Sequence, residues 1–202
     1  MSIDLTGMAL FTLAAVVLLG SPGPAIAALV AVGRTEGIMR GLRFYGGLQV
    51  GLAAAAAFSA AGLFSLVQSI PAATVVMSTV ATIYLLYLAY KIATSPVGNG
   101  TDVSGAVPAS TALGGFLLGV TNPKAYVAFA SLMASYSVVR SDGPADATAK
   151  WLLCVIVMIV VDLAWLWLGA IVQKAKLSAG AERLLNVAMG GTIVITAIIA
   201  LI

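Results

Sequence analysis

The stretch LLGSPGPAIAAL, residues 18–29, interrupts an apolar run with two prolines. A second apolar run, LLGVTNPKAYVAF at residues 117–129, is interrupted in a similar way. Proline lacks a backbone N–H and clashes with the carbonyl four residues earlier, so Pro22, Pro24 and Pro123 predict two broken helices. Each break frees backbone carbonyls and begins a half-helix whose unpaired N–H groups and partial positive charge attract an anion.

The composition around these breaks indicates a membrane protein. The chain has 202 residues, of which 61% are hydrophobic and 8% are charged, and its mean hydropathy is +1.11. Soluble domains carry about 25% charged residues, so the bilayer must be the solvent. Because unpaired backbone groups are too costly in lipid, both breaks must face a polar cavity or packed protein.

The same composition argues against several classes of function. The chain has no histidine and one cysteine, Cys154. It therefore offers no internal disulfide and lacks the commonest ligand of transition metals, and we expect no cofactor and no metal. The net charge of +3 is small and gives no reason to expect a nucleic-acid partner.

The apolar runs predict an all-α protein with six membrane spans of about 20 residues or more. The Gly-, Ser- and Pro-rich loop at residues 93–109 divides the chain near its middle. We expect a three-helix repeat at 1–95, a linker at 96–109 and a second three-helix repeat at 110–202. Three is odd, so the second repeat enters the membrane inverted, and helices 1 and 4 carry the breaks. The expected spans are Met8–Val32, Leu42–Val67, Pro71–Ile92, Ser110–Ser137, Trp151–Val172 and Leu184–Ile202.

The distribution of basic residues predicts the orientation. Arg140 and Lys150 lie on one side of the six-span arrangement, and seven basic residues lie on the other. The positive-inside rule places the loop at residues 33–43 in the cytoplasm and both termini outside. In a rival arrangement the SPGP segment is a re-entrant hairpin, which leaves five spans and an internal N-terminus. The seven residues are Arg34, Arg40, Arg43, Lys91, Lys174, Lys176 and Arg183.

Lys124 and Asp162 are the ionisable residues well inside the expected spans, at a depth similar to that of Pro22. A charge at the centre of a membrane helix costs about 2.5–3.5 kcal/mol on insertion scales, so we expect both to face inward. Lys124 offers a positive charge for a carboxylate. Asp162 offers a carboxylate for an ammonium group, or a carrier for a proton. A purely structural ion pair between them is the alternative.

These arguments give one set of candidate residues around the two breaks. Gln49 either lines the cavity or forms a hydrogen bond across helices. The Gly-xxx-Gly pairs at residues 47–51 and 115–119 predict close helix packing, and a face rich in Gly and Ala is compatible with a homodimer. Asp162 is the candidate for proton coupling. The candidate substrate-binding residues are Ser21, Pro22, Gly23, Pro24, Gln49, Asn122, Pro123, Lys124 and Asp162.

Five stretches together resemble the LysE family of amino-acid exporters, especially its homoserine/threonine (RhtB-type) branch. They are SPGPA at 21–25, EGIMRGLRFYGGLQVG at 36–51, YLLYLAYK at 84–91, GGFLLGVTNPKAYVAF at 114–129 and VVD at 160–162. The resemblance matches residues 22–24 to the first family motif, residues 122–124 to the second, and Asp162 to the acidic residue of span five. Ala25 stands where the family often has Asn.

The resemblance implies secondary active export of amino acids or close derivatives across the bacterial inner membrane, driven by an ion gradient. We expect the substrate carboxylate on half-helix N-termini and Lys124, and its ammonium on freed carbonyls near Pro22 or on Asp162. Protonation of Asp162 from outside would then release the substrate. Two other classes stay open: a passive channel for small polar solutes, and an intramembrane enzyme that uses Ser21 with Lys124.

Overall fold

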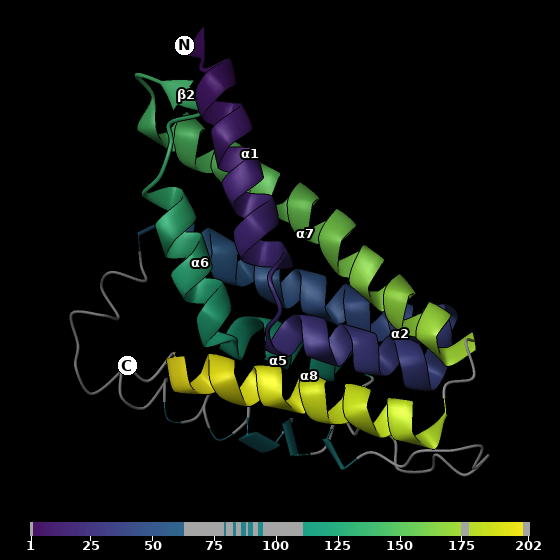
Figure 1. Cartoon of the computed structure of the whole chain (residues 1–202). Helices are drawn as coiled ribbons and strands as arrows, with labels where there is room; N and C mark the ends of the chain where they lie inside the picture. The colour runs from purple at the N-terminus through teal and green to yellow at the C-terminus, as the bar shows by residue number, and fades with distance from the viewer. Residues whose placement is uncertain are drawn as a thin grey trace.

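A computed structural model describes residues 2–62, 111–174 and 178–199, together with positions 79, 83, 86–87, 89–90 and 93–94. The expected third span, apart from those isolated positions, and the expected linker lie outside the described residues. Figure 1 shows the helices and the two short strands. In chain order they are β1 (Ser2–Ile3), α1 (Leu5–Gly20), α2 (Pro24–Ala60), α5 (Ala112–Thr121), α6 (Pro123–Met133), β2 (Val139–Arg140), α7 (Gly143–Lys174) and α8 (Ala179–Ile199).

The first expected break lies between α1 and α2. Helix α1 ends at Gly20, residues 21–23 are non-helical, and Pro24 occupies the first turn of α2. The chain direction changes by 62° across this break. A proline is tolerated in the first turn of a helix because the N–H that it lacks has no partner there. The two prolines therefore end one helix and begin the next.

Helix α2 contains a second change of direction that the sequence analysis did not predict. Gly37 has φ 73° and ψ 177°, a left-handed conformation that favours glycine, and it separates parts 24–36 and 38–60. In Figure 1 the chain reverses at this bend, so that both ends of α2 lie on the same side. The expected spans Met8–Val32 and Leu42–Val67 are thus joined by helix with one bent residue, whereas we expected a loop.

Both parts of α2 pack on α7. In part 24–36, the backbone at Gly33 approaches that of Leu166. In part 38–60, Gln49 is hydrogen-bonded to Asp162, and Ala53 accepts a hydrogen bond from Trp151. Helix α7 therefore runs along both parts of α2, which places its acidic residue beside the first break.

The second expected break is confined to one residue. Helix α5 begins at the cap residue Thr111, whose hydroxyl accepts a hydrogen bond of 3.0 Å from the Gly114 N–H, and it ends at Thr121. Asn122 has extended backbone angles, and Pro123 starts α6. We expected the break to include residues 121–124, but the first and the last two of these belong to helices.

The two Gly-xxx-Gly pairs face each other, and the predicted close packing is confirmed. A Cβ atom on Gly47 would lie 1.8 Å from the Ala112 carbonyl oxygen, and one on Gly115 would lie 2.1 Å from the Phe44 carbonyl oxygen. Such distances leave no space for any side chain. Helices α2 and α5 are therefore in backbone contact.

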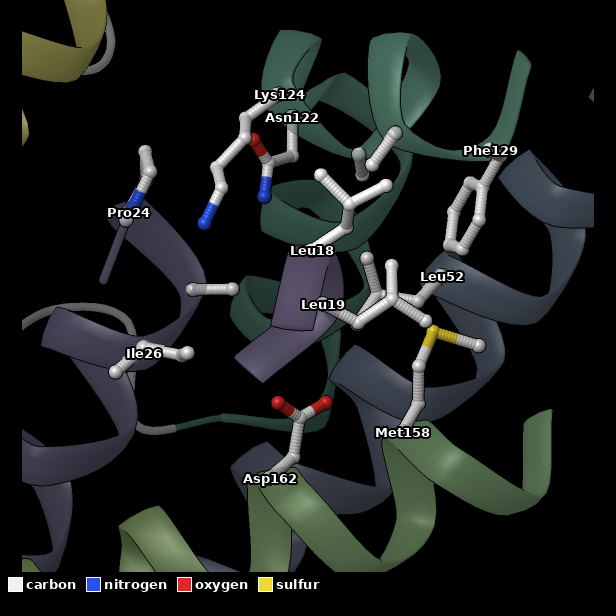
Figure 2. Close-up of a pocket in the computed structure, with 14 residues that line it drawn as sticks. Leu18, Leu19, Pro24, Ile26, Leu52, Asn122, Lys124, Phe129, Met158 and Asp162 are labelled. Atoms are coloured by element: carbon white, nitrogen blue, oxygen red, sulfur yellow. The ribbon is translucent and has the colours of Figure 1, made fainter. Parts of the chain in front are cut away.

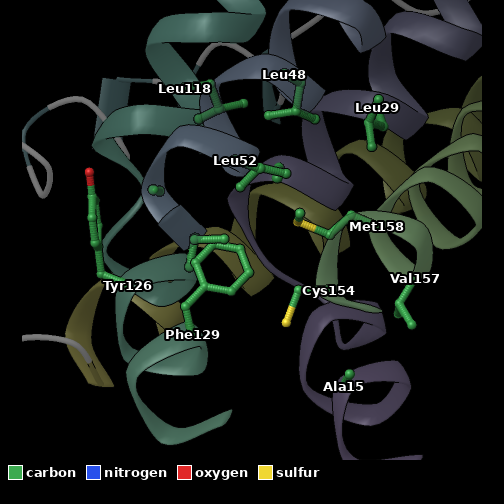
Figure 3. Close-up of a cluster of buried hydrophobic side chains, with 14 of the residues drawn as sticks. Ala15, Leu29, Leu48, Leu52, Leu118, Tyr126, Phe129, Cys154, Val157 and Met158 are labelled. Atoms are coloured by element: carbon green, nitrogen blue, oxygen red, sulfur yellow. The ribbon is translucent and has the colours of Figure 1, made fainter. Parts of the chain in front are cut away.

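A cluster of buried apolar side chains fills the space between α1, α2, α5, α6 and α7 (Figure 3). Leu48, Leu118, Phe129 and Met158 are among its members, each with at most 2% exposure. Cys154 is also fully buried there. Met158 and Leu166, both members of the cluster, lie one helical turn before and one turn after Asp162, so apolar residues flank the acidic residue on α7.

The two ends of the molecule differ in character. At one end, β1 pairs with β2 in antiparallel register, Ser2 opposite Arg140, and Arg140 forms an ion pair with Asp4 at 2.6 Å. We name β1, β2 and this ion pair the clasp. The Gly37 bend and its neighbouring arginines lie at the other end, where Gly33 and Gly41 contact the second half of α7. The arginines near the Gly37 bend and Arg140 of the clasp therefore lie toward opposite ends of α7, and the side of the membrane that each end faces stays a prediction.

Length and composition alone identify few spans among the described residues. Part of α7, Gly143–Val172, is long and apolar enough to cross a membrane, and the bent pair α1–α2 meets the same criterion as a unit. The six-span count and the inverted repeat stay predictions.

Candidate functional site

The two breaks lie beside one cavity, which we name the charged cavity (Figure 2). Its polar part comes from Lys124 and Asn122 at the second break, and from Asp162 on α7. The backbone of Gly23 and Pro24 at the first break also lines it. In Figure 2, Lys124 and Asn122 point into the cavity from one side and Asp162 points into it from the opposite side. The structure therefore brings together the charged residues that the sequence placed at one depth.

Lys124 connects the second break to the first. Its ammonium group donates hydrogen bonds to the carbonyl oxygen of Ser21 and, at 3.1 Å, to that of Pro22. These two carbonyls belong to the non-helical segment that follows α1, where no helical N–H is available to them. The lysine of one broken helix thus satisfies carbonyls of the other.

Ser21 repairs a different defect at the same break. Its hydroxyl donates a 2.8 Å hydrogen bond to the Leu18 carbonyl, which in an unbroken helix would accept from the N–H of residue 22. Pro22 has no N–H, so the serine replaces that hydrogen bond. The hydroxyl points to its own helix, and Lys124 contacts the Ser21 carbonyl rather than the hydroxyl.

Gly23 leaves the space that Lys124 occupies. A Cβ atom on Gly23 would lie 2.8 Å from the Lys124 Cδ atom and 3.0 Å from its Nζ atom. Both distances are shorter than ordinary van der Waals contacts. A larger residue at position 23 would therefore force the Lys124 side chain to shift from its observed position, independently of the extended backbone angles of Gly23.

Asp162 is held by Gln49. The Asp162 side chain is 4% exposed, and its Oδ2 atom accepts a 2.8 Å hydrogen bond from the Gln49 Nε2 atom. The Gln49 Oε1 atom is buried and has no hydrogen-bond partner among the described residues. Of the two interpretations of Gln49, the hydrogen bond across helices is the one observed.

Lys124 and Asp162 do not form an ion pair. In the part of the chain that the structure describes, the ion pairs within 4 Å are Arg140–Asp4 and Lys150–Asp146. The alternative of a purely structural pair is therefore wrong for this structure. The two groups face one cavity from a greater distance, and a molecule that carries both charges can contact both.

Asn122 adds an unsatisfied acceptor. Its side chain is 4% exposed, and its Oδ1 atom has no hydrogen-bond partner within the described ranges. It precedes α6 without capping that helix through its side chain. Pro123, in contrast, starts α6 and does not line the charged cavity. A buried amide oxygen of this kind is free to accept from a bound ammonium group.

The family model of the LysE type translocator matches residues 16–202. The chain belongs to this family. LysE proteins are integral membrane transporters, which indicates that this chain moves amino acids or similar solutes across a bilayer. The resemblance stated from the motifs is confirmed for the family, and the RhtB-type branch stays a prediction. No curated protein and no solved structure matches the chain.

In this LysE protein the charged cavity is narrow. It has about 30 Å³ of space for the centres of water-sized molecules. One buried water needs roughly 10–15 Å³ on such a measure, so the cavity has room for about two waters. An entire amino acid requires the cavity to widen or to continue into neighbouring space.

Sequence reasoning missed the apolar walls of the LysE cavity, which include Leu52, Phe129 and Met158. Apolar residues are common throughout membrane helices, so their residue types do not distinguish a cavity wall from ordinary packing. Their spacing from the charged residues does distinguish them. Met158 precedes Asp162 by four positions, and Ala128, another wall residue, follows Lys124 by four. Residues four apart share a helix face.

Proposed function

We propose that this LysE translocator exports amino acids or close derivatives from the cytoplasm across the bacterial inner membrane by proton antiport. One observation carries the proposal. Lys124 and Asp162 face the same cavity at two helix breaks without pairing to each other. Buried ionisable groups in a membrane protein mark ion and substrate pathways, and broken helices in corresponding positions mark the binding site of a secondary transporter.

The substrate carboxylate would bind between Lys124 and the start of α2. Ala25 and Ile26 lie in the first turn of that helix and line the cavity. The N–H groups of a first helical turn have no helical partners and carry partial positive charge. Lys124 adds a full charge at the same place. Together they favour an anionic group over water.

The substrate ammonium would bind Asp162, which enters the cavity from the side opposite Lys124. The carbonyls of Ser21 and Pro22, the other expected acceptors, already accept from Lys124. Of the two expected acceptors for the ammonium group, the freed carbonyls and Asp162, this leaves Asp162. The Gln49 amide, which does not line the cavity, holds the Asp162 carboxylate in position through its hydrogen bond.

A proton arriving from outside would neutralise Asp162 and remove its attraction for the ammonium group. The substrate then dissociates outward, and the proton is released to the cytoplasm when the site faces inward. In each cycle the substrate ammonium group and a proton therefore bind the Asp162 carboxylate in turn, and each excludes the other. This competition couples export to proton movement.

The test is uphill transport in proteoliposomes with an internal pH dye. For the native protein we expect amino-acid movement driven by an imposed pH gradient, accompanied by counter-movement of protons. For Asp162→Asn we expect at least a tenfold loss of uphill transport, because the amide cannot carry a proton. Glu36→Gln, a matched neutralisation near the Gly37 bend, should retain both.

Three outcomes would contradict the proposal. If none of the twenty amino acids stimulates counterflow and no proton signal appears, amino-acid antiport is wrong. If the native protein and Asp162→Asn pass solute downhill at the same rate without proton movement, the protein is a passive channel. Retention of uphill transport by Asp162→Asn would remove the carboxylate from the mechanism.

A further inference from the structure

A second and larger cavity adjoins the charged one. It lies between part 24–36 of α2, the second half of α7 and α8, and it has about 260 Å³ of space. We name it the apolar cavity. Its walls include Val30 on α2, Trp165 and Leu168 on α7, and Leu185, Ala188 and Met189 on α8.

The two cavities meet at the first break. Gly23 and Ile26 line both of them. Gly23 has no side chain to separate the two spaces, and the Ile26 side chain lies at the same boundary. The charged cavity alone holds about two waters. It can accept the charged groups of an amino acid, and the remaining atoms must lie in adjoining space.

The walls of the apolar cavity suit a hydrocarbon group. Apart from Thr192 and the backbone at the break, the lining side chains are apolar. The Thr192 hydroxyl donates to the Ala188 carbonyl of its own helix at 2.9 Å. A charged or amide side chain in this space would lose its hydrogen bonds to water without replacement. An aliphatic or benzyl group would lose nothing.

We propose that the apolar cavity receives the side chain of the substrate, and that the transporter therefore selects zwitterions with mid-sized apolar side chains. Leucine, isoleucine, valine and methionine have the required chemistry. A cavity of about 150 Å³ is large enough to bind benzene, so the space here accommodates their side chains. This inference rests on the proposed function, since it assumes that the charged groups of the substrate bind at Lys124 and Asp162.

The competing occupant is a lipid acyl chain, because the cavity is open on one side, where Leu168 is 42% exposed. Continuity with the charged cavity favours the substrate. A lipid would fill the space without any relation to Lys124 or Asp162. A substrate spans both cavities, so its affinity depends on the shape of each.

The test changes the size of the apolar cavity in both directions and measures counterflow with a panel of competing amino acids. Ala188→Phe should weaken competition by leucine and methionine at least tenfold and leave alanine unchanged. Met189→Ala should have the opposite effect and improve competition by phenylalanine. Val187→Phe is the matched control, because Val187 is 52% exposed on the same helix and does not line the cavity.

The outcomes separate the two proposals. Counterflow by no amino acid in the native protein would contradict the proposed function itself. Counterflow in which serine or glutamine competes as well as leucine, or in which Ala188→Phe and Met189→Ala leave the ranking unchanged, would overturn only the inference. The occupant of the apolar cavity is checked in a Trp151→Phe/Trp167→Phe protein, in which Trp165 is the remaining tryptophan and brominated lipids quench its fluorescence. Addition of leucine should reduce this quenching. Strong quenching that leucine does not change would show that lipid occupies the cavity.

Discussion

At the scale of single residues, the first break is repaired by two side chains from different places. Ser21 supplies the hydrogen bond that Pro22 cannot donate, and Lys124 reaches across from the second break to the Ser21 and Pro22 carbonyls. Buried backbone groups without partners are strongly disfavoured in membranes. The break is therefore tolerated because these two side chains form hydrogen bonds with the backbone carbonyls that it exposes. Lys124 also has hydrogen-bond partners within the protein when no solute is bound.

Gly23→Ala tests this arrangement. The added methyl group would overlap the Lys124 side chain, whose Cδ atom lies 2.8 Å from the ideal Cβ position. Small displacements of binding groups can reduce turnover by about 100-fold, so we expect a loss of at least tenfold in counterflow rate with little loss of folded protein. Gly191→Ala on α8 is the control, because its Cβ would meet nothing within 4 Å. Native rates in Gly23→Ala would show that the lysine position is irrelevant.

The residue types alone predicted that Lys124 and Asp162 would face one interior site, because charges in lipid are costly. They did not predict that Lys124 would bind the Ser21 and Pro22 carbonyls. Lysine can reach an anion, a carbonyl or water with similar ease, and the choice depends on which backbone groups a distant break leaves free. The partner of Gln49 was equally unpredictable, because it depends on the packing of α2 against α7.

At the scale of elements, helices α2 and α5 depend on their glycines. Gly47→Ala would place a Cβ 1.8 Å from the Ala112 carbonyl oxygen and force the helices apart. Overpacking of this kind costs about 1–3 kcal/mol or more. We expect a clearly lower melting temperature in detergent. Gly46→Ala, at the next position with nothing within 4 Å, should melt like the native protein. Equal melting of both variants would contradict the backbone contact.

The clasp predicts a pH dependence of stability. The Gly7 N–H, followed by the Arg140 side chain, holds the pKa of Asp4 below its ordinary value of 3.8. A lowered pKa means that the carboxylate stabilises the fold above that value, and that this contribution is lost as the pH falls through the folded-state pKa.

Asp4→Asn isolates this effect, because asparagine also caps helices but carries no charge. We expect the native protein to melt above Asp4→Asn at neutral pH, and the difference between them to shrink as the pH falls below 3.8. Intrinsic tryptophan fluorescence during heating gives the measurement. A difference that stays constant down to low pH would assign the effect to something other than the ion pair.

The bend at Gly37 shows where element prediction from the sequence fails. Hydropathy placed a loop over residues 33–43, because the charged residues there lower the local average. Only Gly37 departs from helical angles, and the Thr35 hydroxyl donates to the Ala31 carbonyl at 3.0 Å within the continuing helix. Charged residues at a membrane surface can remain helical, so hydropathy locates the turn but not its shape.

At the scale of the whole molecule, the clasp and the Gly37 bend mark its two ends. The positive-inside rule places the bend in the cytoplasm and the clasp outside. Met39 is 77% exposed at the bend. Gly143 lies beside the clasp at the start of α7, where a Cβ would meet nothing within 4 Å. The two positions therefore report the orientation from opposite sides.

Cysteine labelling checks this orientation. In right-side-out membrane vesicles, a membrane-impermeant maleimide should react with Gly143→Cys and not with Met39→Cys, and the pattern should reverse in inverted vesicles. Native Cys154 is fully buried and gives a low background. The opposite pattern would invert the topology and would contradict the positive-inside prediction.

The order of the motifs, from the proline break to Asp162, was enough to predict the family, which the match over residues 16–202 confirms. The same order could not give the number of spans or the relation of the two halves. An apolar run of a given length fits a straight span, a bent span or a re-entrant segment, because length does not show whether surrounding protein satisfies a break in the backbone.

The contact between Lys124 and the carbonyls of Ser21 and Pro22 has a further consequence for the transport cycle. The ammonium group of Lys124 already has hydrogen-bond acceptors when no substrate is bound. Once Asp162 carries the incoming proton, neither charged group of the empty site lacks compensation, and the carrier can return without an amino acid. We therefore expect net efflux into solute-free medium, rather than strict one-for-one exchange.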